Sequence, residues 1–117
     1  METRDPSPRR VLVAAADPDG DDTGVGGLAI ALRDAGYEVI QAGSGQPAAA
    51  VARMAVDEDV DAVGVWLDDA ARRSEGKLDA ERVEARLVAD GADVPVVEVS
   101  SGDSPEAMVA ALDAAFG

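Results

Sequence analysis

The sequence has 117 residues, of which 24 are acidic and 10 are basic, so its formal net charge is −14. A chain of this length forms one domain whose core buries roughly two thirds of the unfolded chain's surface, so folding needs neither a metal nor a disulfide. Cysteine and histidine are both absent. Their absence excludes thiol chemistry, imidazole bases, imidazole metal ligands and nucleophiles activated by histidine.

The charge and the hydropathy pattern also limit partners and location. An excess of carboxylates repels nucleic-acid phosphates and anionic lipid, so we expect no nucleic acid and no membrane partner. No apolar run approaches the roughly 20 residues that span a bilayer, and Met1 to Arg10 lack the apolar stretch of a secretory signal. The expected location is therefore cytoplasmic.

The charged residues resemble those of halophilic proteins from salt-saturated cytoplasm. Sixteen of the acids are Asp, and Lys77 is the only lysine among the ten cations. Short, dense carboxylates hold water at high ionic strength, where salt screens their mutual repulsion. We therefore expect stability to rise with salt.

The first half of the chain predicts a strand, a loop and a helix after a flexible polar tail at residues 1–9. Val11 to Ala15 is a continuous apolar run, typical of a strand buried on both faces. Asp17 to Gly24 is rich in turn-forming residues. From about Thr23, apolar residues recur at helical spacing until Gly36, which suits a helix C-terminus.

The proposed domain comprises residues 10–117, and the part after Gly36 repeats this alternation of strand and helix. We expect the second strand to end at Gly43, Ser44 and Gly45, and the helix after it to begin with Pro47 as its first residue. We also expect Ser104 to cap the last helix, which begins at Pro105. The predicted strands and helices are Tyr37–Ala42 (strand), Ala48–Val56 (helix), Asp61–Leu67 (strand), Leu78–Ala89 (helix), Val94–Val99 (strand) and Pro105–Phe116 (helix).

Four alternations of strand and helix predict an α/β domain with a parallel sheet and helices on both faces. Ligands of such folds bind beyond the carboxyl ends of the strands. Any functional residues should therefore lie in the four following loops, Ala16–Gly24, Gly43–Gln46, Asp68–Gly76 and Ser100–Asp103.

Four segments resemble a known family. They are Arg10–Ala14 (RVLVA), Asp19–Gly24 (DGDDTG), Ala31–Ile40 (ALRDAGYEVI) and Asp57–Gly64 (DEDVDAVG). In order and spacing they are similar to the cobalamin-binding domain of methylmalonyl-CoA mutase. The resemblance implies a flavodoxin-like domain of about four strands in the order 2-1-3-4. It also implies that catalysis belongs to a separate barrel domain or large subunit, and that the partner is that subunit or a second copy of the chain.

The cofactor motifs of that family are degenerate in this chain. The family has D-x-H-x-x-G after the first strand, where the histidine binds cobalt from below and the aspartate orients it. Asp19 and Gly24 match this pattern, but Asp21 stands at the histidine position. A carboxylate is a poor replacement for the nitrogen donor that cobalt prefers.

The family's two other cofactor contacts also differ. Trp66 lies where small polar residues are expected after the third strand, and Glu98, Val99 and Ser100 replace glycines after the fourth. Trp66 is interpreted as a plug in the cavity for the cofactor's tail. The candidate binding residues are thus a degenerate set, Asp19, Asp21, Gly24, Trp66 and Ser100.

The resulting hypothesis is an accessory or interaction module, not catalytic alone, that has lost histidine-ligated cobalamin and holds no cofactor. One alternative is a mutase subunit that carries cobalamin with the cofactor's own base or a water below the metal. Another is a receiver-like phosphoacceptor, in which Asp17, Asp19 and Asp68 hold Mg²⁺ and Ser100 or Ser101 acts as a switch hydroxyl. The lysine that receivers place after a fifth strand is missing.

Arg82 and Arg86, four residues apart with Glu81 and Glu84 nearby, form a local basic cluster. Intrahelical ion pairs on a solvated face are one explanation. A docking surface for an acidic partner is the other.

Overall fold

The computed structural model describes residues 9–15, 22–44, 46–67, 80–100 and 104–115. They form four strands and four helices in strict alternation. In chain order these are β1 (Arg10–Ala15), α1 (Asp22–Asp34), β2 (Glu38–Ser44), α2 (Ala48–Asp57), β3 (Ala62–Leu67), α4 (Ala80–Ala89), β4 (Val96–Ser100) and α5 (Pro105–Ala115).

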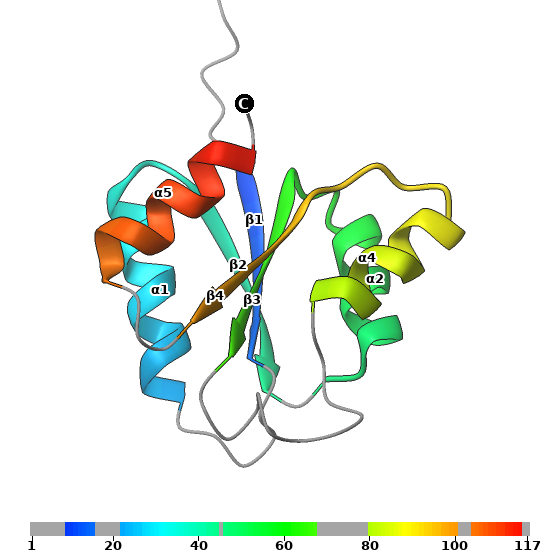
Figure 1. Ribbon diagram of the computed structural model, residues 1–117, viewed down its shortest axis with the longest axis horizontal. Coiled ribbons are helices and arrows are strands. Elements are labelled where there is room, and N and C mark those ends of the chain that lie inside the picture. Colours follow the sequence, from blue (N-terminus) through cyan, green and yellow to red (C-terminus); the bar gives the residue numbers. More distant parts are fainter. Residues whose placement is uncertain (1–8, 16–21, 45, 68–79, 101–103, 116–117) are drawn as a thin grey trace, which may run out of the picture.

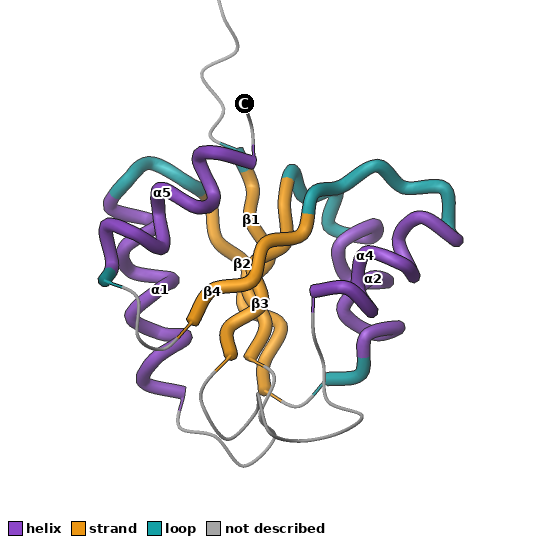
Figure 2. Tube along the Cα trace, in the orientation of Figure 1, coloured by secondary structure: helices purple, strands orange, loops and turns teal. Residues whose placement is uncertain are grey.

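The four strands form one parallel sheet in the order β2-β1-β3-β4. Helices α1 and α5 cover one face and α2 and α4 the other, which gives three layers (Figure 1). The same view coloured by secondary structure shows the sheet as the middle layer (Figure 2). The predicted fold class and strand order are confirmed.

Each face of the sheet has its own core, because successive strand residues point to opposite sides. In β1, Leu12 and Ala14 pack against α2 and α4, whereas Val11 and Val13 pack against α1 and α5. We call these the α2/α4 core and the α1/α5 core. The described residues bury no polar or charged side chain, which suits a strand pattern of uninterrupted aliphatic residues.

Several predicted element boundaries are wrong by a few residues. Gly43 and Ser44 continue β2, where an irregularity in register between Val13 and Ala15 accommodates the extra residue. Gly24 is the third residue of α1 and not part of the preceding loop. Pro47 is the N-cap of α2, with extended backbone angles, and precedes the first helical residue.

Three helices end with the same hydrogen-bonded motif. After α1, the Tyr37 N–H donates to the Leu32 carbonyl while Gly36 has φ +100°. The equivalent residue is Gly91 (φ +78°) after α4 and Asp59 (φ +53°) after α2. This left-handed residue lets the chain turn sharply into the next strand. The expected role of Gly36 is confirmed.

Helix α5 begins as its sequence predicts. The Ala107 N–H donates to Ser104 Oγ over 3.1 Å, and Pro105 is the first helical residue. Ser104 thus satisfies an amide that has no partner within the helix, while proline lacks one to satisfy.

Candidate functional site

The carboxyl edge of the sheet brings two of the predicted site residues together. In the parallel register, Trp66 of β3 pairs with Ala15 of β1 on one side and with Val99 of β4 on the other. Ser100 is the last residue of β4 and pairs with Leu67, so the expectation that it follows the strand is wrong. Trp66 and Ser100 therefore lie on adjacent strands at the edge where this fold class binds ligands.

The three remaining candidates, Asp19, Asp21 and Gly24, follow β1 in the sequence. Asp19 and Asp21 lie outside the described residues, and so does Asp17. Gly24 lies in the first turn of α1. The structure therefore does not bring Asp19 or Asp21 together with Trp66.

Trp66 packs on the α1/α5 side of the sheet. Its side chain is partly buried and contacts the α1/α5 core, which includes Ala15, Met108 and Leu112. At the neighbouring Gly64, a Cβ would make ordinary van der Waals contacts, 3.6 Å from Val13 and 3.8 Å from Leu112. Aromatic and aliphatic side chains thus fill the space between β3 and α5.

Glu98 is directed toward the other face of the sheet. One of its carboxylate oxygens, Oε2, lies 3.4 Å from the Ala80 amide, which donates to it at the start of α4. An anion is favourable there because the first amides of a helix lack partners within the helix. Glu98 therefore helps to hold α4 against β4.

The described residues contain no group of three acidic side chains that could hold a metal ion. The acids of the receiver hypothesis, Asp17 and Asp68, lie outside those residues, as does Lys77. No helix in the described ranges is long and apolar enough to cross a bilayer.

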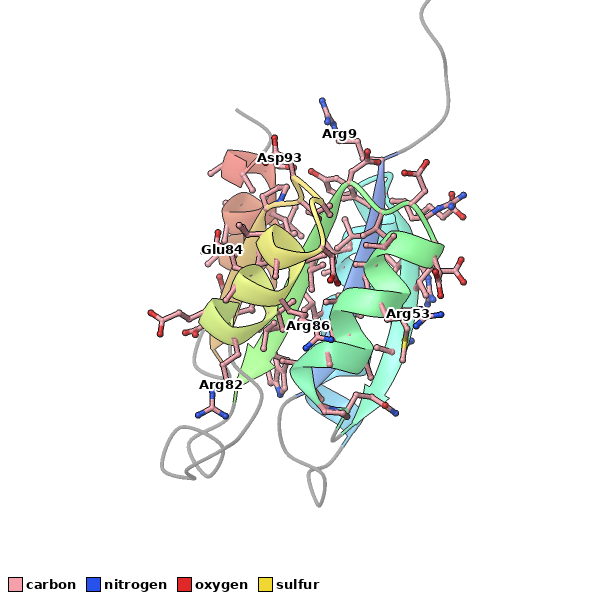
Figure 3. All side chains as sticks on the ribbon, turned by 90° about the vertical axis from the view of Figure 1, so that its right-hand side faces the viewer. Arg9, Arg53, Arg82, Glu84, Arg86 and Asp93 are labelled. Atoms are coloured by element: carbon pink, nitrogen blue, oxygen red, sulfur yellow. The ribbon has the colours of Figure 1, made fainter. Side chains whose placement is uncertain are left out.

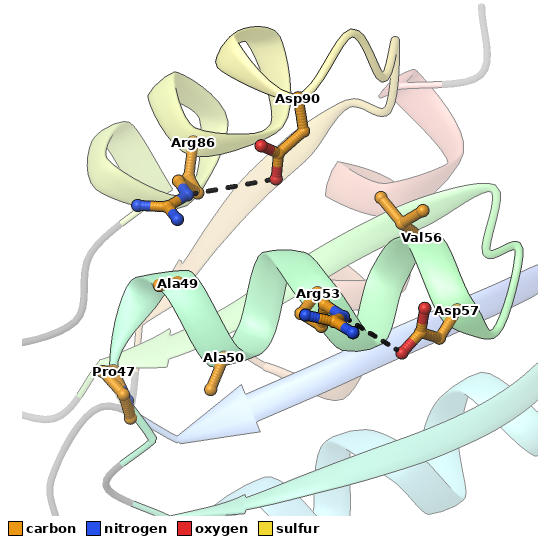
Figure 4. A pocket seen from close by; sticks show the side chains of 8 residues that line it. All are labelled: Pro47, Ala49, Ala50, Arg53, Val56, Asp57, Arg86 and Asp90. Carbon is orange, nitrogen blue, oxygen red and sulfur yellow. Dashed lines mark ion pairs between the residues drawn. The ribbon is translucent and has the colours of Figure 1, made fainter.

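Two surface grooves between paired helices were not predicted from the sequence. The α2/α4 groove has a volume of about 610 Å³ and is lined by residues of both helices and their ends (Figure 4). They are Pro47, Ala49, Ala50, Arg53, Val56, Asp57, Arg86 and Asp90.

The second groove lies on the opposite face of the molecule. This α1/α5 groove has a volume of about 450 Å³ and is lined by Ala31, Asp34, Ala35, Glu106, Val109, Ala110 and Asp113. Among the described residues that line it, three are acidic and none is basic. Asp113 also accepts a hydrogen bond from the Tyr37 hydroxyl, which links α5 to the start of β2.

No family model matches the sequence. Over about half of its length, the chain is similar to the small subunits of two CoA mutases. It is 48% identical over 63 residues to the 2-hydroxyisobutanoyl-CoA mutase small subunit of Aquincola tertiaricarbonis, and 45% identical over 58 residues to the pivalyl-CoA mutase small subunit of Xanthobacter autotrophicus.

The similarity covers only part of each protein. The two matches span 54% and 50% of this chain, and 46% and 39% of the relatives. A chain from the methanol:cobalamin methyltransferase complex MtaBC of Methanosarcina barkeri superposes with a TM-score of 0.69 at 19% identity. That match covers 92% of this chain and 46% of the other. At this identity, the similarity establishes a shared fold.

Proposed function

We propose that this chain is a small-subunit module of a CoA mutase, which acts beside a separate catalytic subunit and, having lost the histidine ligand, holds no cobalamin. The observation that carries the proposal is the combination of 48% identity to a mutase small subunit over 63 residues with a sequence free of histidine. The resemblance to the methylmalonyl-CoA mutase domain supports the same division of labour, with acyl-CoA chemistry on the larger partner.

The donor chemistry of the chain does not fit histidine-ligated cobalamin. Cobalt in this cofactor prefers a nitrogen ligand, and Asp21 replaces the expected histidine. Two aspartates at the motif positions, Asp19 and Asp21, would repel one another, whereas the family pairs an orienting acid with imidazole. The chain therefore lacks both the histidine that would bind cobalt and the aspartate–histidine pair that would orient it.

The packing beneath the carboxyl edge supports the same proposal. Trp66 contacts the α1/α5 core, and the side chains of Val13 and Leu112 lie within van der Waals distance of the position that a Cβ at Gly64 would take. A cofactor tail placed between the sheet and α5 would need to displace these side chains. Displacement from a close-packed core opposes binding.

A second candidate function is a cofactor-carrying subunit in which cobalamin keeps its own base or a water below the metal. Two observations favour it, namely the retained Asp19 and Gly24 of the loop motif and a fold shared with a chain of a cobalamin methyltransferase complex. In this alternative, Asp21 makes no bond to the metal.

Titration with hydroxocobalamin, followed by corrin absorption, separates the two candidates. The proposed module leaves the spectrum unchanged at micromolar ligand. The matched variant D21H restores the missing nitrogen donor. If D21H binds hydroxocobalamin and the unmodified chain does not, the missing histidine is the reason that the chain does not bind the cofactor. If neither protein binds it, packing at the carboxyl edge also excludes the cofactor. A spectral change with the unmodified chain would refute the proposal and favour the carrier.

The partner can be tested independently of the cofactor. The chain, purified with bound proteins from its native host at the salt concentration of that cytoplasm, should bring a mutase large subunit with it. Reconstitution from the two purified subunits, measured by sedimentation, should then give a complex. A large subunit that is present in the cell yet never associates with the chain would contradict the proposed role.

A further inference from the structure

The α2/α4 groove is bordered by two ion pairs of the same polarity. On α2, Arg53 Nε lies 3.6 Å from Asp57 Oδ2, and on α4, Arg86 Nε lies 3.9 Å from Asp90 Oδ2 (Figure 4). In both pairs the arginine precedes the aspartate by four residues. Each side of the groove therefore carries a cation followed, one helical turn later, by an anion.

The charge balance of this groove is unusual for so acidic a chain. Its lining has two arginines and two aspartates, whereas the lining of the α1/α5 groove has Asp34, Glu106 and Asp113 and no base. A second copy of the chain has a net charge of −14. The all-acidic groove would repel such a partner, while the balanced groove offers both signs of charge.

From this we infer that the α2/α4 groove is the contact surface of a two-fold homodimer. A closed dimer brings the same patch of both copies together, so the patch must be complementary to itself. A two-fold axis that lies in the plane of the interface, across both helices and above the midpoints of the two ion pairs, reverses the direction from arginine to aspartate. Arg53 then faces Asp57 of the second copy, and Arg86 faces its Asp90.

Apolar surface is available for the same contact. Val56 is 47% exposed, and Ala49, about two turns earlier on α2, also lines the groove and is exposed. Figure 3 views the molecule from this side, with Arg53 and Arg86 both on the facing surface. Small and branched apolar residues in the lining let the helices of two copies approach closely, while the charged pairs set their register.

Salt should favour this dimer. The intrachain pairs are well exposed, with 80% for Arg53 and 62% for Asp57, so exchanging their partners costs little. The long-range repulsion between two chains of −14 is screened within about 3 Å at 1 M salt, while contacts across the interface are screened less. We expect dimerisation to strengthen between dilute buffer and molar KCl.

Charge-exchange variants test the inference by sedimentation equilibrium of the full chain in molar KCl. R53D and D57R each place like charges opposite one another in the dimer, and each should weaken dimerisation by about ten-fold or more. The double variant R53D/D57R is again complementary to itself and should dimerise like the parent chain. An equimolar mixture of R53D and D57R should form a heterodimer, which native mass spectrometry distinguishes by mass.

Two matched controls separate the contact from net charge. R33D on α1 changes the charge as R53D does, and E84R on α4 changes it as D57R does, but neither residue lines the groove. Both should dimerise normally. Circular dichroism verifies that every variant is folded. A chain that remains monomeric in molar KCl at all concentrations would overturn the inference, as would a dimer that R53D leaves intact or R33D disrupts equally.

Discussion

Replacing Asp59 by glycine should stabilise the protein mainly through the backbone. Asp59 has φ +53°, and the Val60 N–H after it donates to the Ala55 carbonyl, 3.1 Å away. Residues with a Cβ are strained in the left-handed region by roughly 1–2 kcal/mol, and an aspartate by less than most. Glycine removes this strain but adds freedom to the unfolded chain, which offsets part of the gain. We expect D59G to gain about 0.5–1 kcal/mol.

The two glycines at equivalent positions provide the reverse experiment. A Cβ at Gly36 or Gly91 would meet nothing within 4 Å, so alanine there costs only the backbone strain. G36A and G91A should each lose about 1 kcal/mol. The free energy of unfolding should therefore rise in D59G and fall in G36A and G91A, although all three positions share one hydrogen-bond pattern. This result would show that the turn conformation, and not a side-chain contact, determines the change.

The free energy of unfolding is best measured by urea denaturation at a fixed, high salt concentration. D59G also removes a negative charge near the C-terminal end of α2, where an anion is unfavourable. D59N removes the same charge and keeps a side chain, so it is the matched control. The difference between D59G and D59N isolates the backbone effect. Equal stability of these two variants, or a loss with D59G, would refute the reasoning.

Three further predictions concern charge and local hydrogen bonds. The melting temperature should rise from dilute buffer to molar KCl, because salt screens the repulsion among 24 acids; no rise would refute a halophilic character. S104A should lose about 1 kcal/mol in urea denaturation and S104D much less, since only the aspartate can still accept from the Ala107 amide. R10M should lose about 1 kcal/mol of unfolding free energy, because the Arg10 guanidinium pairs with Glu38 at 3.3 Å and donates to the Glu58 carbonyl. Unchanged stability of R10M in urea denaturation would show that these contacts contribute nothing.

Local sequence signals were sufficient for most of the fold. Continuous aliphatic runs identify strands buried on both faces, and Gly36 and Ser104 mark helix ends by their own chemistry. Asp59 could not be identified in this way, because its left-handed conformation follows from the short connection between α2 and β3. Gly43 and Ser44 continue β2 through pairing with β1, which is a tertiary effect that overrides their preference for turns.

The candidate site was harder to anticipate. Its predicted place at the carboxyl edge follows from topology, and Trp66 and Ser100 do lie on adjacent strands there. The α2/α4 groove was missed because its charges come from two helices that are distant in sequence. Arg86 was considered beside Arg82, Glu81 and Glu84, yet its ion pair is with Asp90, one turn further along.

Hydrogen bonds join the strands at the amino end of the sheet. The Glu38 amide donates to the Arg9 carbonyl, and the Asp61 amide donates to the Arg10 carbonyl. The Arg10 amide in turn donates to the Asp61 carboxylate. The first two bonds join main-chain atoms, so side-chain substitutions leave both partners in place. Of these three bonds, only the one to Asp61 can be removed by truncating a side chain.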